Sequence, residues 1–323
     1  MKSINFVILG DYNNSLAGEL GKKGTTTDIA IYDRKTSDAI YTWSAPVTFP
    51  EKIQSLMQAV NIAEYAILNV TKIDKYLGEI IIALDSLNFK DGMILHSYEV
   101  DEGKLKALFK NTSVSHFKFL DSIDQLKQEM STLEPKACDG PLMIPVDHAF
   151  DVKGVGTVVL GVVKQGVVKV YDQLKIVPSG KDILVKSIQM HDDPVQESKS
   201  PSRVGLAIKG ISAEEISRGD VLCSPDTFSS SQVNIVSAET TTSKISTTNF
   251  AKNPYYKGDL AENQMYMISI GLQIKPVKLK LSNGTVIEVK PESKPVAFFP
   301  GQTYVLLKPD SQGTRIIGRG IIE

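Results

Sequence analysis

The side chains that most often carry out chemistry are few in this chain. It has four histidines and two cysteines, Cys138 and Cys223, which are far apart and in no metal-ligand spacing. This cysteine usage indicates a reduced cytosolic protein without disulfides or a zinc site. His148 and His191 have no Ser or Cys nucleophile and acid in a recognisable arrangement with them. We therefore expect these histidines to take part in binding and expect no catalytic residue.

The charge balance excludes a protein that coats nucleic acid non-specifically. The 323 residues include 36 Lys and Arg against 37 Asp and Glu, a formal net charge of -1, so no global positive field attracts a polyanion. A localised RNA site is still compatible, because a neutral total can include a basic face. The chain has no apolar run near the roughly 18 residues of a membrane span and no signal-peptide core. We expect a soluble cytoplasmic protein that binds neither DNA nor a membrane.

The elements that must position any site follow two patterns. Residues 1–135 alternate apolar runs with stretches whose apolar residues recur every three or four positions. The predicted strands are Phe6–Leu9, Ile29–Tyr32, Ile40–Trp43, Ala66–Val70, Met93–His96 and Phe117–Leu120. The predicted helices are Glu51–Val60, Tyr76–Leu87, Lys104–Lys110 and Ser122–Leu133. This alternation predicts a mostly parallel sheet covered by helices on both faces.

From Cys138 onward, short β-branched runs punctuated by Gly and Pro predict two small barrels. The first set is Val155–Val163, Gly166–Val170, Leu174–Val177, Ile183–Met190, Val204–Lys209 and Asp220–Cys223. The second set is Met265–Lys275, Val277–Leu281, Val286–Val289, Thr303–Leu307 and Thr314–Ile322. Ser/Thr-rich stretches at 229–231 and 240–243 mark the junction between the sets. We predict an α/β domain over residues 1–137, a β-barrel over 141–228 and a second β-barrel over 232–323.

The most specific motif is the glycine-rich stretch Phe150–Gly161. Gly154 and Gly156 permit a tight turn, and the β-branched run after them supplies a buried strand. Taken alone, the motif is a barrel hairpin. Its neighbours, up to residue 222, add further turns and strands that match a known family in order.

Residues 150–222 resemble the second domain of EF-Tu, of elongation factor 1 alpha and of SelB. The final stretch Arg315–Ile322 looks like the closing strand of SelB-type factors. The resemblance is to factors of archaeal type, and it is close to the SelB-like factors of methanogens called EF-Pyl. It implies a P-loop-GTPase-like domain followed by two β-barrels.

The resemblance also implies GTP-binding motifs in the first domain, and these are largely degenerate. The family's loop reads Gly-x-x-x-x-Gly-Lys-Ser/Thr; its N–H groups, lysine and hydroxyl contact the phosphates and Mg²⁺. Gly10 begins such a loop, but Ser15 stands at the second glycine, Leu16 at the lysine and Ala17 at the hydroxyl residue. The segment from Gly10 to Gly24 is also short. Either the loop has been deleted or a few residues are missing from the sequence.

Other nucleotide motifs of the family have partial counterparts. Gly24–Asp28 resembles switch I, which makes Thr26 the candidate Mg²⁺ contact; the alternative is a polar turn before a strand. The family's Asp-x-x-Gly-His is replaced by Ser44–Thr48. Thr71–Asp74 matches the guanine-reading Thr-Lys-x-Asp but follows the wrong strand, so we interpret it as coincidence, and Glu99 is the candidate substitute. We expect weak GTP and Mg²⁺ binding, if any, and absent or very slow hydrolysis.

A pocket for the aminoacylated 3′ end of tRNA is a further implication of the resemblance. The residues carried over to the terminal adenosine are Val152, Val158, Gln189 and Leu206. The residues carried over to the aminoacyl group are His148, Phe150, His191, Asp192 and Arg203. The family has a carboxylate at the position of Gln189 and a basic residue at that of Asp192.

Two expectations about this pocket depend on packing. Val152, Val158 and Leu206 are alternatively explained as barrel core. Gln189, His191 and Arg203 are expected on strand ends at the barrel surface, where truncation leaves little cavity.

The leading hypothesis is a monomeric elongation-factor-like protein that binds a particular aminoacyl-tRNA and the ribosome, with weakened or lost GTP dependence. One alternative is a functional GTPase that delivers a special aminoacyl-tRNA. The other is a regulator that binds the ribosome or sequesters tRNA. A GTP titration separates the GTPase from the other two, and co-purification with tRNA or ribosomes separates delivery from sequestration.

Overall fold

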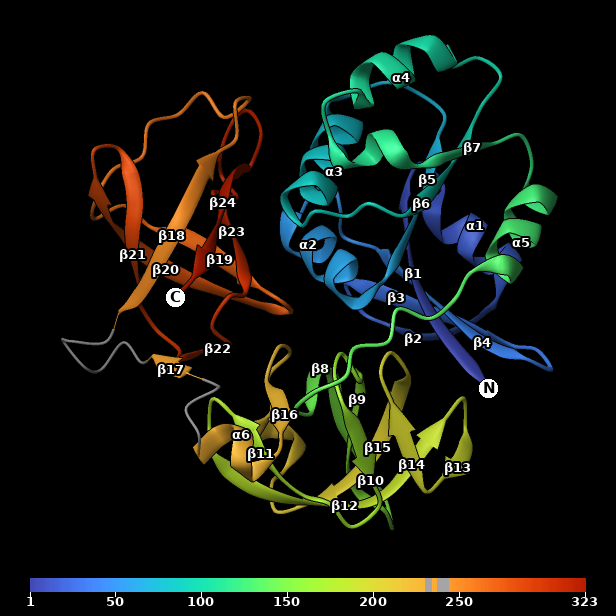
Figure 1. Cartoon of the computed structure of the whole chain (residues 1–323), viewed down its shortest axis with the longest axis vertical. Helices are drawn as coiled ribbons and strands as arrows, with labels where there is room; N and C mark the ends of the chain where they lie inside the picture. Colours follow the sequence, from blue (N-terminus) through green and yellow to red (C-terminus); the bar gives the residue numbers. More distant parts are fainter. Residues whose placement is uncertain (230–233, 237–243) are drawn as a thin grey trace. The chain divides into compact units, whose positions relative to one another are not determined.

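A computed structural model describes residues 1–229, 234–236 and 244–323, and divides the chain into two compact units, Met1–Lys136 and Ala137–Glu323 (Figure 1). The predicted junction at 229–231 and 240–243, and the predicted start of the third domain at 232, lie largely outside the described residues. No helix of the described residues is long and apolar enough to span a membrane.

The first unit is built on a seven-stranded sheet with the order β2-β3-β4-β1-β5-β6-β7. The strands are β1 (Lys2–Gly10), β2 (Lys22–Thr26), β3 (Ile29–Lys35), β4 (Ala39–Pro46), β5 (Tyr65–Val70), β6 (Gly92–His96) and β7 (Lys118–Leu120). The helices are α1 (Asn13–Leu20), α2 (Ile53–Ile62), α3 (Lys75–Ser86), α4 (Glu102–Phe109) and α5 (Ile123–Thr132), with a 3-10 turn η1 (Ser113–His116). From β4 to β7 the strands are parallel, and β2 and β3 add an antiparallel edge. The predicted mostly parallel sheet is confirmed.

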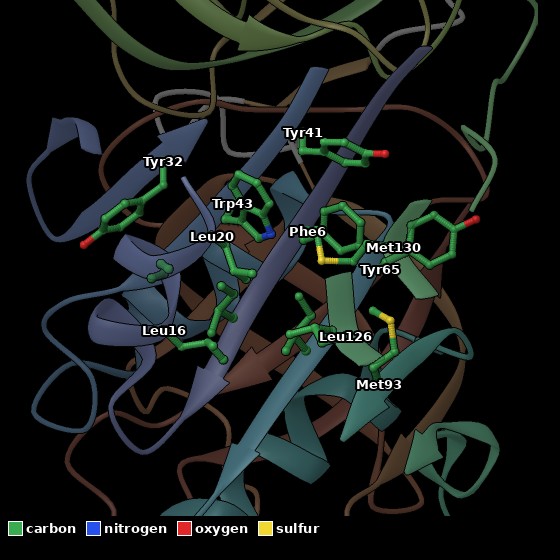
Figure 2. Close-up of a cluster of buried hydrophobic side chains, with 14 of the residues drawn as sticks. Phe6, Leu16, Leu20, Tyr32, Tyr41, Trp43, Tyr65, Met93, Leu126 and Met130 are labelled. Atoms are coloured by element: carbon green, nitrogen blue, oxygen red, sulfur yellow. The ribbon is translucent and has the colours of Figure 1, made fainter. Parts of the chain in front are cut away.

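An aromatic core lies between this sheet and the helices α1 and α5 (Figure 2). The ring of Phe6 on β1 lies 6.1 Å from that of Trp43 and 5.7 Å from that of Tyr65, measured between centroids. Leu126 and Met130 of α5 pack on the same cluster. The helices α2 and α3 cover the opposite face of the sheet (Figure 1). The sheet therefore has the two helical layers that the alternation predicts.

The structure differs from the sequence prediction between residues 10 and 28. The prediction there is a degenerate loop followed by a switch-like turn, whereas the structure has α1 and the edge strand β2. Leu16, Ala17 and Leu20 are spaced as neighbours on one helix face and all three are buried. The two positions at which the motif comparison expects a lysine and a hydroxyl thus serve as the buried face of a helix.

The second unit begins with a β-barrel in the strand order β11-β16-β8-β9-β15-β12-β13, which an additional β11–β12 pairing closes. Its strands are β8 (Met143–Val152), β9 (Gly156–Val162), β11 (Gln173–Val177), β12 (Lys181–Met190), β13 (Asp193–Val195), β15 (Arg203–Lys209) and β16 (Val221–Cys223). A separate pair is formed by β10 (Val167–Lys169) and β14 (Glu197–Lys199), and η2 (Ala213–Glu215) is a 3-10 turn. Val159, Ile188 and Leu206 are among the fully buried residues of this barrel's core.

The remaining strands form a closed barrel in the order β18-β21-β20-β19-β23-β24. They are β18 (Ile245–Lys252), β19 (Tyr266–Ile270), β20 (Gln273–Ser282), β21 (Thr285–Pro291), β23 (Thr303–Leu307) and β24 (Ile316–Ile322). A short pair, β17 (Asn234–Val236) and β22 (Val296–Phe298), and a five-residue helix, α6 (Pro225–Ser229), complete the described elements. The prediction of one strand over Met265–Lys275 is wrong, because the chain reverses at Gly271, where φ is 53°. The predicted order of an α/β domain followed by two β-barrels is confirmed, while the domain boundaries stay a prediction.

The aromatic core yields a stability prediction for the first unit. Replacing Phe6 by alanine removes a fully buried ring and should lower the free energy of unfolding by about 3–5 kcal/mol. Urea titration followed by fluorescence measures this directly, because Trp43 is the only tryptophan of the chain. The control Tyr98→Ala, at a side chain 93% exposed, should change stability by less than about 0.5 kcal/mol. Equal effects of the two substitutions would contradict this assignment of the core.

Candidate functional site

Two rows of side chains lie on the outer face of the first barrel. Directly opposite residues of antiparallel strands point to the same side of a sheet. In one row the partners across β8, β9, β15 and β12 are His148, Leu160, Gly205 and Gln189. In the next row they are Phe150, Val158, Ala207 and Ser187. These eight residues are called the outer face below.

The outer face combines apolar surface with one amide. Phe150 is 41% exposed, and Val152, two residues further along β8, is 36% exposed. Gly205 has no side chain, so the middle of the face is recessed. A Cβ atom added there would lie 3.3 Å from the Cδ2 atom of Leu160. Gln189 is exposed at the end of its row. A flat ring laid on this face would meet apolar groups below it and an amide at its edge.

Leu206 does not belong to this face, and its prediction as a pocket residue is wrong. Its direct partners are Val159 and Ile188, and all three are buried in the barrel core. The next residue, Ala207, faces outward beside Val158. The explanation as barrel core therefore applies to Leu206, whereas Val158 is half-buried and Val152 exposed. The signal available in the sequence was the alternation along β15, where every second residue is a large apolar one.

His191 and Asp192 form the turn between β12 and β13. Met190 pairs with Asp193, so these two residues are the centre of a two-residue hairpin turn. Their φ angles are 49° and 65°, a left-handed region that costs energy for residues other than glycine. Such conformations often occur at functional sites. Both side chains are exposed and lie just beyond Gln189 on the same strand end.

Arg203 is placed differently from the prediction. Its guanidinium makes two hydrogen bonds to the carboxylate of Asp147, one of them 2.9 Å long. The Nδ1 atom of His148 lies 2.5 Å from the same carboxylate. Asp147 is 2% exposed, and the side chain of Arg203 is 13% exposed. The expectation that Arg203 stands at the barrel surface is therefore wrong. Its side chain is largely buried, because the buried carboxylate of Asp147 requires a charged partner beside it.

The carboxyl group of Asp147 stays ionised in spite of its burial. Desolvation alone would raise its pKa, but the charge of Arg203 and the hydrogen bonds from His148 and Arg203 outweigh it. The net result is a pKa below the usual value for aspartate. Asp147 thereby joins β8 to β15 at the edge of the outer face.

The first unit has a second group of polar residues at the carboxyl edge of its parallel strands. Only Asp11 and Tyr12 connect the end of β1 to the start of α1. A cavity of about 310 Å³ on one side of this turn is lined by residues that include Gly10, Asp11, Phe49, Lys72 and Tyr76. Another cavity of about 240 Å³ on the other side is lined by residues that include Ser15, Asn69, His96, Asp121 and Ser122.

The four residues predicted for nucleotide binding do not gather at one place. Gly10 and Ser15 line the two cavities at this edge. Thr26 is exposed at the end of the edge strand β2 and Glu99 lies in an exposed turn, and neither lines either cavity. His96 and Asp121 line the same cavity as Ser15. Sequence reasoning missed them, although residues at the carboxyl ends of parallel strands commonly line ligand sites.

Two motif-like segments have structural roles. Asp74, the last residue of Thr71–Asp74, accepts hydrogen bonds from the N–H groups of Tyr76 and Leu77 and so caps α3. The hydroxyl of Ser44 lies 3.1 Å from the carbonyl oxygen of Phe6 and 2.9 Å from that of Ala59. It therefore ties β4 to β1 and α2 inside the unit.

The turn between β1 and α1 stands at the place of the family's phosphate loop. The turn has two residues where the motif has a loop, and Leu16 and Ala17 are buried where a lysine and a hydroxyl are needed. Among the residues described, no group of three or more His, Cys, Asp or Glu side chains could hold a metal ion.

The chain is similar to one protein-family model and to two curated proteins of one organism. Residues 156–223 match the family model Elongation factor Tu domain 2. The chain is 33% identical over 304 residues to uncharacterized protein MJ0325 of Methanocaldococcus jannaschii, and the alignment covers 94% of each chain. It is 30% identical over 233 residues to the selenocysteine-specific elongation factor of the same organism, covering 65% of this chain and only 50% of that factor.

Among solved structures, translation elongation factor SelB from Methanococcus maripaludis in complex with the GTP analogue GPPNHP matches with a TM-score of 0.83. The match covers 100% of this chain and 79% of that chain at 24% identity. At this identity the similarity establishes the fold, an α/β GTPase-like domain followed by two barrels.

The Asp147 network yields a pH-dependent prediction. Replacing Asp147 by asparagine leaves Arg203 partly buried without a counter-charge and should cost about 3–5 kcal/mol at neutral pH. Because the pKa of Asp147 is lowered on folding, its contribution is complete above the unfolded value of about 3.9 and is lost as the pH falls through the folded value. Urea titrations followed by circular dichroism should therefore give a constant difference from pH 5 to 8 that shrinks below about pH 4.

The control for this prediction is Asp182→Asn. Asp182 pairs with Lys175 at 2.7 Å but its side chain is 82% exposed, so its loss should cost at most about 1 kcal/mol. A cost for the Asp147 variant that stays the same at pH 3 would refute the assignment of an ionised buried carboxylate.

Proposed function

Because the chain belongs to the SelB- and EF-Tu-like family of elongation factors, we propose that it binds aminoacyl-tRNA and acts at the ribosome. In this proposal the protein is a cytoplasmic monomer, binds neither DNA nor membranes, and has a weakened or lost dependence on GTP. The more specific likeness to EF-Pyl remains a prediction.

The observation that carries the proposal is the outer face. A base without its stacking neighbours is held by apolar surfaces and by hydrogen bonds to its edge. Val152 and Val158 offer the apolar surface, and Gln189 offers an amide that can donate to and accept from adenine. Phe150, which the resemblance assigns to the aminoacyl group, lies beside Val158 and is here assigned to the base as well. Leu160, which is half-buried on the outer face, extends the surface in place of Leu206. The site is thus supported by the register of four strands rather than by any single residue.

The aminoacyl group is assigned to the end of the face next to the hairpin turn. His191 and Asp192 are the polar residues there, and His148 lies at the opposite end of the same row. Arg203 has an indirect role in this proposal, because its guanidinium is already bound by Asp147. Asp192 is a local negative charge near a polyanion, and its exposed position in the turn allows water to screen the repulsion.

Charge distribution along the chain supports an RNA ligand. Residues 244–323 contain eleven Lys and Arg against six Asp and Glu, a formal charge of +5, so the rest of the chain carries -6. Contacts with a phosphate backbone draw their affinity from such local positive charge. The near-neutral total thus conceals a basic barrel, which offers the RNA backbone a counterpart to the end-binding face.

A functional GTPase is the second candidate, and it rests on the fold shared with a SelB that binds a GTP analogue. The edge of the first unit argues against it in this chain. The lysine, the hydroxyl and the loop with which the family stabilises the developing charge of the transition state are missing from this chain. The tRNA- or ribosome-binding regulator differs from the leading proposal in its biological outcome, not in the ligands it requires.

The end-binding face can be tested by substitution. We expect Gln189→Ala to weaken binding of aminoacyl-tRNA by about 1–2 kcal/mol, since one adenine hydrogen bond is lost. Phe150→Ala should weaken it by about 1–3 kcal/mol through lost contact with the base. Fluorescence anisotropy with charged, uncharged and end-trimmed tRNA provides the measurement, and charged tRNA should bind most tightly.

The matched control is Gln173→Ala, an exposed glutamine on β11 outside the outer face. It should leave the affinity unchanged. Equal affinity for all three tRNA forms, insensitive to the substitutions at Gln189 and Phe150, would mean that the face is inherited without the function.

Hydrolysis is a separate prediction. Losing a charge-stabilising group typically lowers the rate by about a hundredfold or more, and this chain lacks both the phosphate-loop lysine and the water-positioning histidine. We expect no GTP turnover above background when purified ribosomes and charged tRNA are added. Robust ribosome-stimulated phosphate release would overturn this part of the proposal and favour the GTPase.

A further inference from the structure

The carboxylate of Asp11 is bound within the chain at the edge of the first sheet. Its Oδ2 atom accepts hydrogen bonds from the backbone N–H of Thr71 at 3.0 Å and from the hydroxyl of Thr71 at 2.7 Å. The main chain of Asp11 is bound as well. Its N–H donates to the carbonyl of Asn69 at 2.8 Å, and its carbonyl accepts from the Asn69 side-chain amide at 2.7 Å. Four hydrogen bonds thus join the β1–α1 turn to the end of β5.

Gly10 makes this close approach possible. Its φ is 96°, and a Cβ atom at this position would lie 2.1 Å from the carbonyl oxygen of Asn69. Any other residue would force β1 and β5 apart at this edge and break the contacts of Asp11. The glycine that sequence comparison assigns to a phosphate loop therefore serves the closure of the turn.

Three backbone N–H groups at this edge already donate hydrogen bonds within the chain. The N–H of Thr71 is occupied by the Asp11 carboxylate, that of Asn14 by the side chain of Asn13, and that of Leu16 by the carbonyl of Tyr12. Asp74 places a second carboxylate at the same cavity, paired with Lys72 at 3.2 Å. A triphosphate at this edge would meet the carboxylates of Asp11 and Asp74, and like charges at close range repel; the one lysine lining this cavity, Lys72, is already paired with Asp74.

We propose that Asp11 is a built-in anion that fixes this edge in one nucleotide-independent conformation, so that aminoacyl-tRNA binding by this chain is not controlled by GTP or GDP. The second half of this inference rests on the proposed function. The physical basis of the proposal is that a nucleotide shifts the equilibrium between two conformations of the protein only if it binds one of them more tightly than the other. An edge whose donors are bound internally offers a nucleotide no such difference.

The first test uses the full chain with 1 mM GTP or GDP and excess Mg²⁺. The melting temperature should stay within about 1 °C of the nucleotide-free value, since a ligand that binds the folded state raises it by mass action. The dissociation constant for aminoacyl-tRNA should agree within twofold in all three conditions. A rise of several degrees, or a tenfold difference in tRNA affinity between GTP and GDP, would overturn the proposal.

The second test follows hydrogen exchange at the amide of Thr71. Asp11→Ala removes its acceptor, so exchange at this amide should become at least tenfold faster, and the melting temperature should fall by a few degrees. Asp11→Asn keeps an acceptor oxygen and should lie between the alanine variant and the wild type. The matched control Glu19→Gln removes an exposed carboxylate of α1 at the same edge and should leave this exchange unchanged.

The outcomes of the two tests separate the two proposals. A chain that binds no tRNA in any condition refutes the proposed function, and the exchange rates and melting temperatures still decide the closure by Asp11. A chain that binds tRNA with unaltered Thr71 exchange in Asp11→Ala keeps the proposed function and refutes the closure.

Discussion

The register that joins β8, β9, β15 and β12 is the constraint on which the candidate site depends. A shift of one residue along any of these strands would turn the outer face inward and expose the barrel core. The register is held by the buried row of Val159, Leu206 and Ile188, and by the ion pair of Asp147 and Arg203 that joins β8 to β15. Packing inside the barrel thus determines which side chains can meet a ligand outside it.

Local sequence patterns were sufficient for the fold and for part of the site. Periodicity predicted the parallel sheet and the two barrels. The structure brings Phe150, Val158 and Gln189 to one face, while their role in binding stays a proposal. Leu206 was misplaced because a motif aligned by position ignores which side of a strand a residue occupies. Arg203 was misplaced because its partner, Asp147, is 56 residues away in the chain and pairs with it only in the folded barrel.

In the first unit, the stretch that resembles the start of a phosphate loop makes contacts within the chain. Gly10 still ends β1, but the next residues enter a helix whose buried face includes Leu16 and Ala17. The side chain of Asp11 then accepts hydrogen bonds from the N–H and the hydroxyl of Thr71. Sequence comparison detected the missing groups. It could not detect what replaced them, because the new contacts join residues sixty positions apart.

In the proposed function, the 3′ end of tRNA lies on the outer face of the first barrel. This claim can be tested with aminoacyl-tRNA that carries a photoreactive adenosine at its 3′ terminus, crosslinked to the full chain and mapped by mass spectrometry of the peptides. The account predicts crosslinks in residues 148–160 and 187–207, which disappear when unlabelled charged tRNA competes. Crosslinks confined to residues 1–136, or none that competition removes, would contradict it.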